Sequence, residues 1–174
     1  MKDYIVQAGK NQIRLSSSGS CQLCGSAVKG GIHECVDMFE GLCSRALSDP
    51  RFAQVHLLAV DAHALQHPEI HGKLSNHFHL LRLHLLLQRG ADPALGVRHA
   101  VLDDLLSHPT GWPALKAPAP GHRGSVTVAE VACEPPEEHE TGVRAWAGSV
   151  YAAWRLHHEW AERALHTLGK RRIA

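Results

Sequence analysis

A pair of closely spaced cysteines constrains the fold more than any other feature of the sequence. Cys21 and Cys24 are followed at once by Gly25, and a third cysteine, Cys35, lies a short distance further along the chain. Two thiolates at this spacing can chelate one tetrahedral zinc ion, and the glycine permits the tight turn that directs backbone amides towards the sulfur atoms. The cysteine spacing therefore predicts a metal-binding knuckle at residues 21–35.

The cysteines alone do not identify a fourth ligand. The chain has no second CxxC motif of the kind that zinc ribbons carry, so the candidates are His33, Cys43 and a distant histidine. Cys43 lies two helical turns beyond Cys35, too far along the axis for easy closure, and a buried apolar cysteine is the alternative there. The CxxC pair could also be a redox dithiol or two inert thiols. In a reducing compartment, a metal or redox site is more expected than a disulfide.

Histidine is unusually frequent, with 15 of 174 residues. Neutral imidazole is a good ligand for zinc, copper and iron. His63 and His67 are four residues apart and His56 precedes His63 by two helical turns, so a helix would place all three on one face. His67 and His56 are the stronger ligand candidates, with Asp61 as a hydrogen-bond partner for a ligating imidazole. The alternative is that these histidines cover the solvent-exposed side of an amphipathic helix.

Two further imidazole pairs occur at 77–79 and 157–158. Adjacent or alternate positions diverge around a helix, so only one member of each pair can face a shared site. His79 and His158 are the better candidates because their helical neighbours are apolar. The alternative is a histidine at the edge of the core, hydrogen-bonded to protein groups. We expect the remaining histidines at the surface: His71, His84, His99, His108, His122, His139 and His166.

Apolar periodicity predicts a mainly α fold, a bundle of about five helices that follows an N-terminal zinc-knuckle-like arm. Helices are expected from Glu34 to just before Pro50, from Arg51 to Gln66, from Ser75 to Gln88, from about Ala94 to Leu106 and from Glu140 to Leu168. A one-turn helix at 128–132 would be capped by Thr127. Residues 1–20 are expected to form the arm, with a small hairpin around Gly9 to Asn11, and residues 21–174 a single helical domain.

Composition and charge restrict the class of protein. The apolar content of 44% is enough for a core, and 18 basic against 17 acidic residues give a net charge of +1. This balance gives no electrostatic reason to expect nucleic acid or an anionic membrane as a partner. The start of the sequence lacks the apolar region of a signal peptide, and no apolar run approaches the about 20 residues that cross a bilayer. We expect a soluble, cytoplasmic protein; no protein partner or small-molecule substrate can be identified.

The order of these motifs resembles a bacterial family of unknown function that consists of small helical proteins. The resemblance covers about residues 21–160 and is carried by CxxCG, a later cysteine, HLLxVDAxxxQHP from His56, SxxxHL from Ser75 and WAxxVxxAWxxHH from Trp146. It implies that the site residues are Cys21, Cys24, Cys35, His56, His67, His79 and His158. His63 departs from the pattern, which has tyrosine there. No activity comes with the family.

Three functional hypotheses follow. In the first, the three cysteines and one imidazole hold a structural Zn²⁺ that ties the arm to the bundle. In the second, helical histidines form an open site suited to metal-dependent hydrolysis or oxygen chemistry, although the chain has no HExxH motif or nucleophile elbow. In the third, the many histidines handle copper or nickel. The sequence favours the first.

Overall fold

α-Helices form nearly all of the regular structure in residues 3–90 and 112–171, the part of the chain that this computed structural model describes. The mainly α prediction is confirmed, since these residues contain seven α-helices and no β-strand. The α-helices are α1 (Asp3–Lys10), α2 (Gly31–Ser48), α3 (Pro50–Ala53), α4 (His56–Gln66), α5 (Lys73–Gln88), α7 (Pro136–Ala153) and α8 (His158–Arg171). Three short 3-10 helices are η1 (Pro68–Ile70), η3 (Val128–Glu130) and η4 (Arg155–His157). The helix predicted at 94–106 lies outside the described residues.

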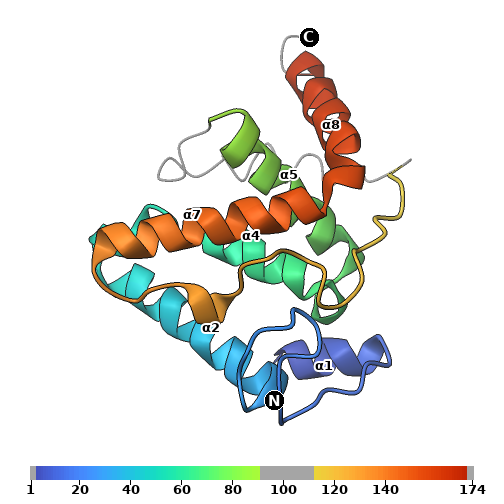
Figure 1. Ribbon diagram of the computed structural model, residues 1–174. Helices are drawn as coiled ribbons and strands as arrows, with labels where there is room; N and C mark the ends of the chain where they lie inside the picture. The colour runs from blue at the N-terminus through green and yellow to red at the C-terminus, as the bar shows by residue number, and fades with distance from the viewer. Residues whose placement is uncertain (1–2, 91–111, 172–174) are drawn as a thin grey trace.

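Helix α4 lies at the centre of the bundle. It packs against α2, α5 and α7, and Figure 1 shows α7 crossing it while α8 extends to the far end of the molecule. Most of its side chains are buried, among them Leu58 and Leu65, so it behaves as a core helix with little amphipathic character. None of the described helices combines the length and the apolar character that a membrane crossing requires.

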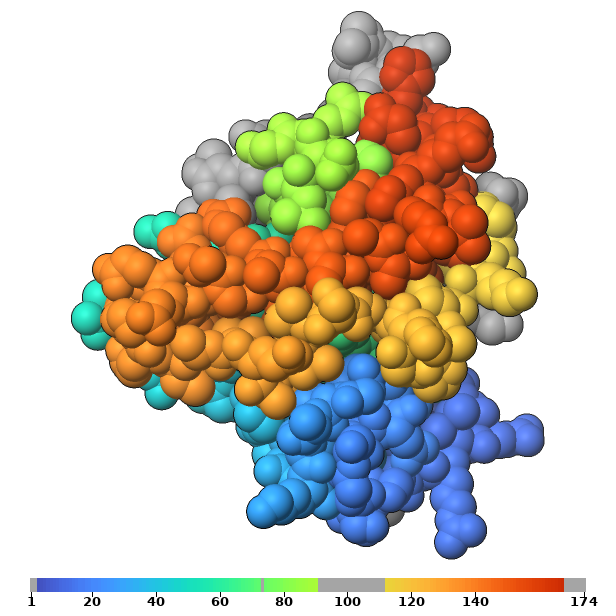
Figure 2. Space-filling view, viewed as in Figure 1, coloured from blue at the N-terminus to red at the C-terminus, as the bar shows by residue number. Residues whose placement is uncertain are grey.

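Residues Asp3–Lys10 of the N-terminal arm form helix α1 and residues 11–20 are loop, so the hairpin prediction is wrong. Helix α1 carries Asp3 in its first turn and Lys10 in its last, which complements the helix dipole. Its Ala8 is buried in the main core, and the Tyr4 hydroxyl lies 2.8 Å from His33 Nδ1 on α2. The short segment could form a hairpin or a helix. Packing of the apolar face of α1 against α2 and η1 therefore favours the helix. Figure 2 shows this N-terminal chain, in blue, massed beneath α7.

Two of the predicted helices are each divided. The segment 51–66 is split between α3 and α4, and the segment 140–168 is split at Trp154, where η4 separates α7 from α8. At the second break, Trp154 caps the end of α7, and its indole N–H donates to the carbonyl of Leu65 on α4 at 3.1 Å. The predicted turn at 128–132 is present as η3, with Thr127 and Glu130 forming a capping box.

Candidate metal centre

Four side chains that come from distant parts of the sequence meet in the core. Cys21, Cys24, Cys35 and His67 each offer one ligand atom, and these atoms all lie within 4.8 Å of one another. All four residues are buried, with exposed fractions of 3% or less. The knuckle supplies the first two, α2 the third, and the C-terminal end of α4 the fourth. This group is a buried Cys3His site that could hold a metal ion.

The distances within the group agree with a tetrahedral zinc site. The Sγ atoms of Cys24 and Cys35 are 3.7 Å apart, and the Sγ atoms of Cys21 and Cys35 each lie 3.5 Å from His67 Nε2. Bonds of about 2.3 Å to sulfur and about 2.0 Å to nitrogen at tetrahedral angles would separate two sulfurs by about 3.8 Å and a sulfur from a nitrogen by about 3.5 Å. The donors thus fit Zn²⁺, and the cysteines are free thiols.

Backbone geometry shapes the knuckle around its sulfur atoms. Gly25 has a φ of +82°, and its N–H donates to the carbonyl of Cys21 at 2.8 Å, which closes the turn. The next residue, Ser26, directs its backbone N–H to Cys24 Sγ at 3.4 Å. Such N–H···S contacts stabilise thiolate charge, because the amide dipole points at the sulfur. Gly25 and Ser26 therefore form the tight turn, with a backbone amide directed at a sulfur atom, that the CxxCG motif predicts.

Cys35 is positioned by the start of α2. Gly31, the first residue of that helix, has a φ of +59°, and a Cβ at this position would lie 2.2 Å from the carbonyl oxygen of Ser16. The N–H of Ile32 donates to the same oxygen at 3.2 Å. Only glycine fits here, and the close approach fixes the polar linker 16–20 beside the helix that carries Cys35.

His67 is held in one tautomer by its own helix. Its Nδ1–H donates to the carbonyl of His63 at 2.7 Å, which leaves the Nε2 lone pair directed at the cysteines. The His63 ring stacks on His67 at a centroid distance of 4.1 Å and on Phe39 at 3.9 Å. Phe39 and His63 therefore hold the ligand ring in place.

The electrostatics of the group favour a cation. Hydrogen bonds from Cys24, Cys35 and His67 lower the pKa of Cys21, whereas hydrogen bonds to Cys21 and Cys24, together with burial, raise the pKa of Cys35. Burial opposes charge on His67, but its hydrogen bonds to Cys21 and Cys24 outweigh this and raise its pKa to about 9. The group thus favours a thiolate at Cys21 and bound protons on Cys35 and His67, which balance the negative charge in the core. A divalent cation can replace those protons.

Two tryptophans, Trp146 within α7 and Trp154 at its C-terminal end, bind to the end of α4 that carries His67. The indole N–H of Trp146 donates to Gln66 Oε1 at 2.8 Å, and Gln66 Nε2 in turn donates to the carbonyl of Val126 at 2.9 Å. Trp154 donates to Leu65, as described above. The Gln66-His67-Pro68 and WAxxVxxAW motifs therefore meet in space, and they fix the end of α4 one residue from the ligand.

Trp146→Phe should weaken this support without removing a ligand. It would leave Gln66 Oε1 buried without its donor, which costs about 1–3 kcal/mol of unfolding free energy. Denaturant unfolding should show that loss, while the metal content of the folded protein stays unchanged. Trp160→Phe, at a half-buried ring on α8, is the matched control and should cost less. Equal losses in the two variants would show that the Gln66 bond contributes nothing.

Arg123 is a structural residue that the sequence did not single out. It is 1% exposed, and its guanidinium donates to the carbonyls of Leu23 at 3.4 Å and Gln66 at 3.1 Å and pairs with Glu69. It therefore links the knuckle to the end of α4. An arginine in a loop rich in glycine and proline is normally solvated, so no local signal marks this position.

The other candidate ligands lie outside the Cys3His group. His79 Nδ1 lies 2.8 Å from Asp61 Oδ1, so Asp61 does not orient a ligand; it pairs with His79 and with Arg82. His158 donates from Nε2 to the carbonyl of Tyr151 at 2.8 Å and stacks on that ring. His56 lies at the first turn of α4, at the opposite end from His67, and burial lowers its pKa. His56 also senses the charges of Arg82 and Asp61, so it lies near the pair that His79 contacts, whereas His158 bonds to Tyr151.

Two histidines that were expected at the surface are buried. His84 accepts from the Tyr151 hydroxyl at 2.7 Å through Nδ1 and donates from Nε2 to Glu162 at 2.9 Å. His139 donates from Nδ1 to the carbonyl of Ala132 at 3.0 Å. Imidazole is tolerated in a core when both its ring and its polar atoms have partners, and sequence alone does not show those partners. His99 and His108 lie outside the described residues.

Comparison with known proteins identifies a family. No curated protein and no solved structure matches the chain. A family model described as a family of unknown function, DUF5946, matches residues 19–155. The matched span contains all four donors of the Cys3His group, Gln66 and both supporting tryptophans. The match confirms the resemblance to a family of unknown function: the chain belongs to the DUF5946 family.

Proposed function

We propose that this protein is a zinc-binding helical module in which a single Zn²⁺, held by Cys21, Cys24, Cys35 and His67, has a structural role. The observation that carries the proposal is the donor set: four protein ligand atoms within 4.8 Å of one another, with every contributing residue buried. Structural zinc sites have four protein ligands, whereas catalytic sites keep a position open for water or substrate.

The positions of the donors in the chain support a structural role. The knuckle belongs to an N-terminal segment with little regular structure, Cys35 to α2, and His67 to the central helix α4. Zinc bound there supplies a cross-link between these three segments and neutralises the thiolate charge in the core. An ion at this point compensates for the short, loop-rich arm, which buries few large side chains of its own.

The two alternative functions have weaker support. An open, histidine-lined site would need His56, His79 and His158 to face one point, whereas His79 Nδ1 is bound to Asp61 and His158 Nε2 to the carbonyl of Tyr151. Copper or nickel handling would rest on exposed histidines, whereas several of the described histidines are buried in the fold. Both alternatives remain distinguishable from the structural role by metal content.

Elemental analysis of the purified, tag-free protein tests the proposal. We expect about one zinc per chain after exhaustive dialysis, as tight structural sites show. Cys21→Ser should retain much less zinc after dialysis, because a neutral hydroxyl is a far weaker zinc ligand than the thiolate that it replaces. Cys133→Ser is the matched control: this cysteine is exposed and outside the group, and the variant should keep its zinc. Folded wild-type protein without zinc, or a Cys21→Ser variant with undiminished zinc, would overturn the proposal.

A further inference from the structure

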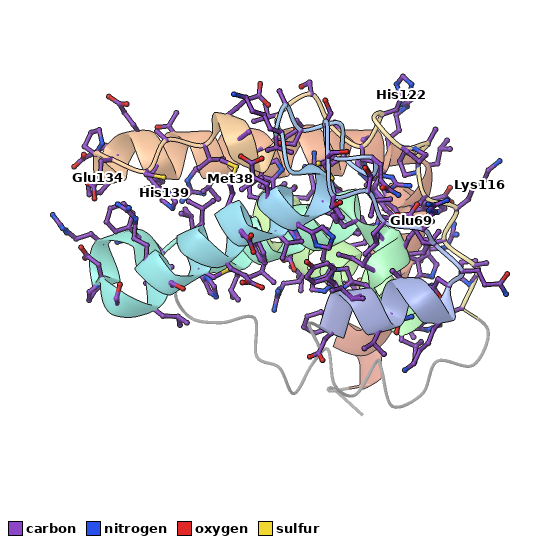
Figure 3. All side chains as sticks on the ribbon, turned by 90° about the horizontal axis from the view of Figure 1, so that it is seen from below. Met38, Glu69, Lys116, His122, Glu134 and His139 are labelled. Carbon is purple, nitrogen blue, oxygen red and sulfur yellow. The ribbon has the colours of Figure 1, made fainter. Side chains whose placement is uncertain are left out.

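A second site lies where the loop of residues 116–122 passes the junction of α7 and α8. A cavity of about 330 Å³ opens there, with the loop on one side and residues 153–157 on the other. Figure 3 shows Lys116 and His122 on this loop, both at the same end of the molecule. Ligand cavities for small molecules begin at about 300 Å³. The volume is thus sufficient for a small organic ligand.

The charged residues that line the cavity are all of one sign. Lys116 and His122 contribute from the loop, Arg155 and His157 contribute from η4, and no acidic residue is among the lining residues. Within the described residues, neither Lys116 nor Arg155 forms an ion pair. Two permanent cations without carboxylate partners, beside two imidazoles, make this cavity attractive to an anion.

The rest of the lining is apolar. Leu156, Ala117, Pro118, Ala119 and Ala153 supply the apolar surface, and the buried Trp154 lies behind it. Leu156 is 80% exposed, so its side chain is accessible to a ligand in the cavity. A ligand that suits both halves of the cavity carries a negative group and a hydrocarbon group.

The walls of the cavity are fixed in advance. His157 donates from Nε2 to the carbonyl of Lys116 at 3.0 Å and so joins the loop to η4. The carbonyl of Pro118 accepts from Arg123 Nε at 2.9 Å, and the Trp154 indole is bound to Leu65. These anchors reduce the entropy lost when a ligand binds.

From this geometry we propose that the cavity binds a small amphipathic anion, a carboxylate or phosphate ester with a short hydrocarbon group. The anionic head lies against Lys116 and Arg155, and the hydrocarbon group covers Leu156, Pro118 and Ala153. Carboxylate and phosphate share the chemistry that these cations recognise. The site is separate from the Cys3His group and contributes no ligand to it.

Isothermal titration calorimetry of the zinc-loaded protein with hexanoate, hexyl phosphate, hexanol and inorganic phosphate tests this site. We expect hexanoate, hexyl phosphate or both to bind, and hexanol and inorganic phosphate each to bind at least tenfold more weakly than the best of them. Affinity should also fall as salt rises, since exposed charges are screened. Preference for one of the two anionic ligands identifies the head group. Equal binding of hexanol, equal binding of inorganic phosphate, or no binding of either amphipathic anion would overturn the proposal.

Two variants locate the binding. Arg155→Gln removes one exposed cation and should weaken the anion about tenfold, whereas Arg144→Gln, an exposed arginine of α7 that is outside the cavity, should leave it unchanged. Ala153→Leu should block the cavity and abolish binding, with circular dichroism and zinc content confirming that the fold and the metal site persist. Binding that survives both Arg155→Gln and Ala153→Leu would place the anion elsewhere and overturn the assignment.

Discussion

Removal of zinc with a strong chelator should unfold the protein cooperatively. Binding free energies of structural zinc sites are about 10–16 kcal/mol, and whole domains of this size are stable by about 5–15 kcal/mol. Cys21, Cys24 and Cys35 belong to the main hydrophobic core, so loss of the ion leaves polar thiol groups and excess charge in its interior. Far-UV circular dichroism and thermal melting of chelator-treated protein should report loss of helix, and added zinc should restore it.

Chelator loaded beforehand with zinc is the control, because it has the same chemistry without the capacity to remove the ion. A second comparison uses one helix: Cys35→Ser removes a donor, whereas Cys43→Ser alters a cysteine of α2 outside the Cys3His group. Burial raises the pKa of Cys43 to about 11, which marks it as a neutral thiol. Cys35→Ser should fail to fold or fold without zinc, and Cys43→Ser should keep both. A zinc-free wild-type protein with its native melting transition would show that the ion is dispensable.

The knuckle could be predicted because its information is local. Cys21, Cys24 and Gly25 are close in sequence, and their spacing specifies a chelating turn wherever the rest of the chain goes. The fourth ligand is different, since the choice among fifteen histidines depends on which of them the fold carries to the knuckle. His67 was a candidate, but its selection depends on α4 ending at that residue, and on Gln66 and Trp146 fixing that end.

The remaining histidine predictions show why pattern alone is insufficient. His56 stands in the same motif as His67 and His79 in the following one, and all three carry the same side chain, yet His79 lies beside Asp61. The position of a histidine on a helix tells which way its side chain points. It does not tell which neighbouring element supplies the partner of that side chain. The same holds for α1, where a short segment has weak local preferences and tertiary contacts decide its structure. Arg123 depends entirely on such contacts, because it joins three segments that are distant in sequence.

Asp61→Asn should cost more stability than Trp146→Phe, although neither residue belongs to the metal centre. Asp61 on α4 is fully buried, and Arg82 on α5 is 4% exposed. Arg82 donates to the Asp61 carboxylate from Nη2 at 2.7 Å and from Nε at 2.9 Å. Asparagine keeps the shape of the side chain but removes the negative charge, and the guanidinium is then buried without a counter-ion. Breaking a buried pair in this way costs about 3–5 kcal/mol. Chemical denaturation of the zinc-loaded protein should show this loss.

The double variant Asp61→Leu/Arg82→Met separates the value of the ion pair from the cost of leaving one charge alone. Removing both charges also removes the need to desolvate them, so apolar side chains should recover part of the stability that Asp61→Asn loses, less the cost of leaving His79 Nδ1 without its Asp61 partner. Glu140→Gln is the exposed control: its pair with Arg144 on α7 is solvated, and the change should stay within about 0.5 kcal/mol. Zinc content should remain at the wild-type level in every variant, because none alters a donor. If the double variant proved no more stable than Asp61→Asn, the pair would be essential for packing α4 against α5, and the recovery expected from its replacement would be refuted.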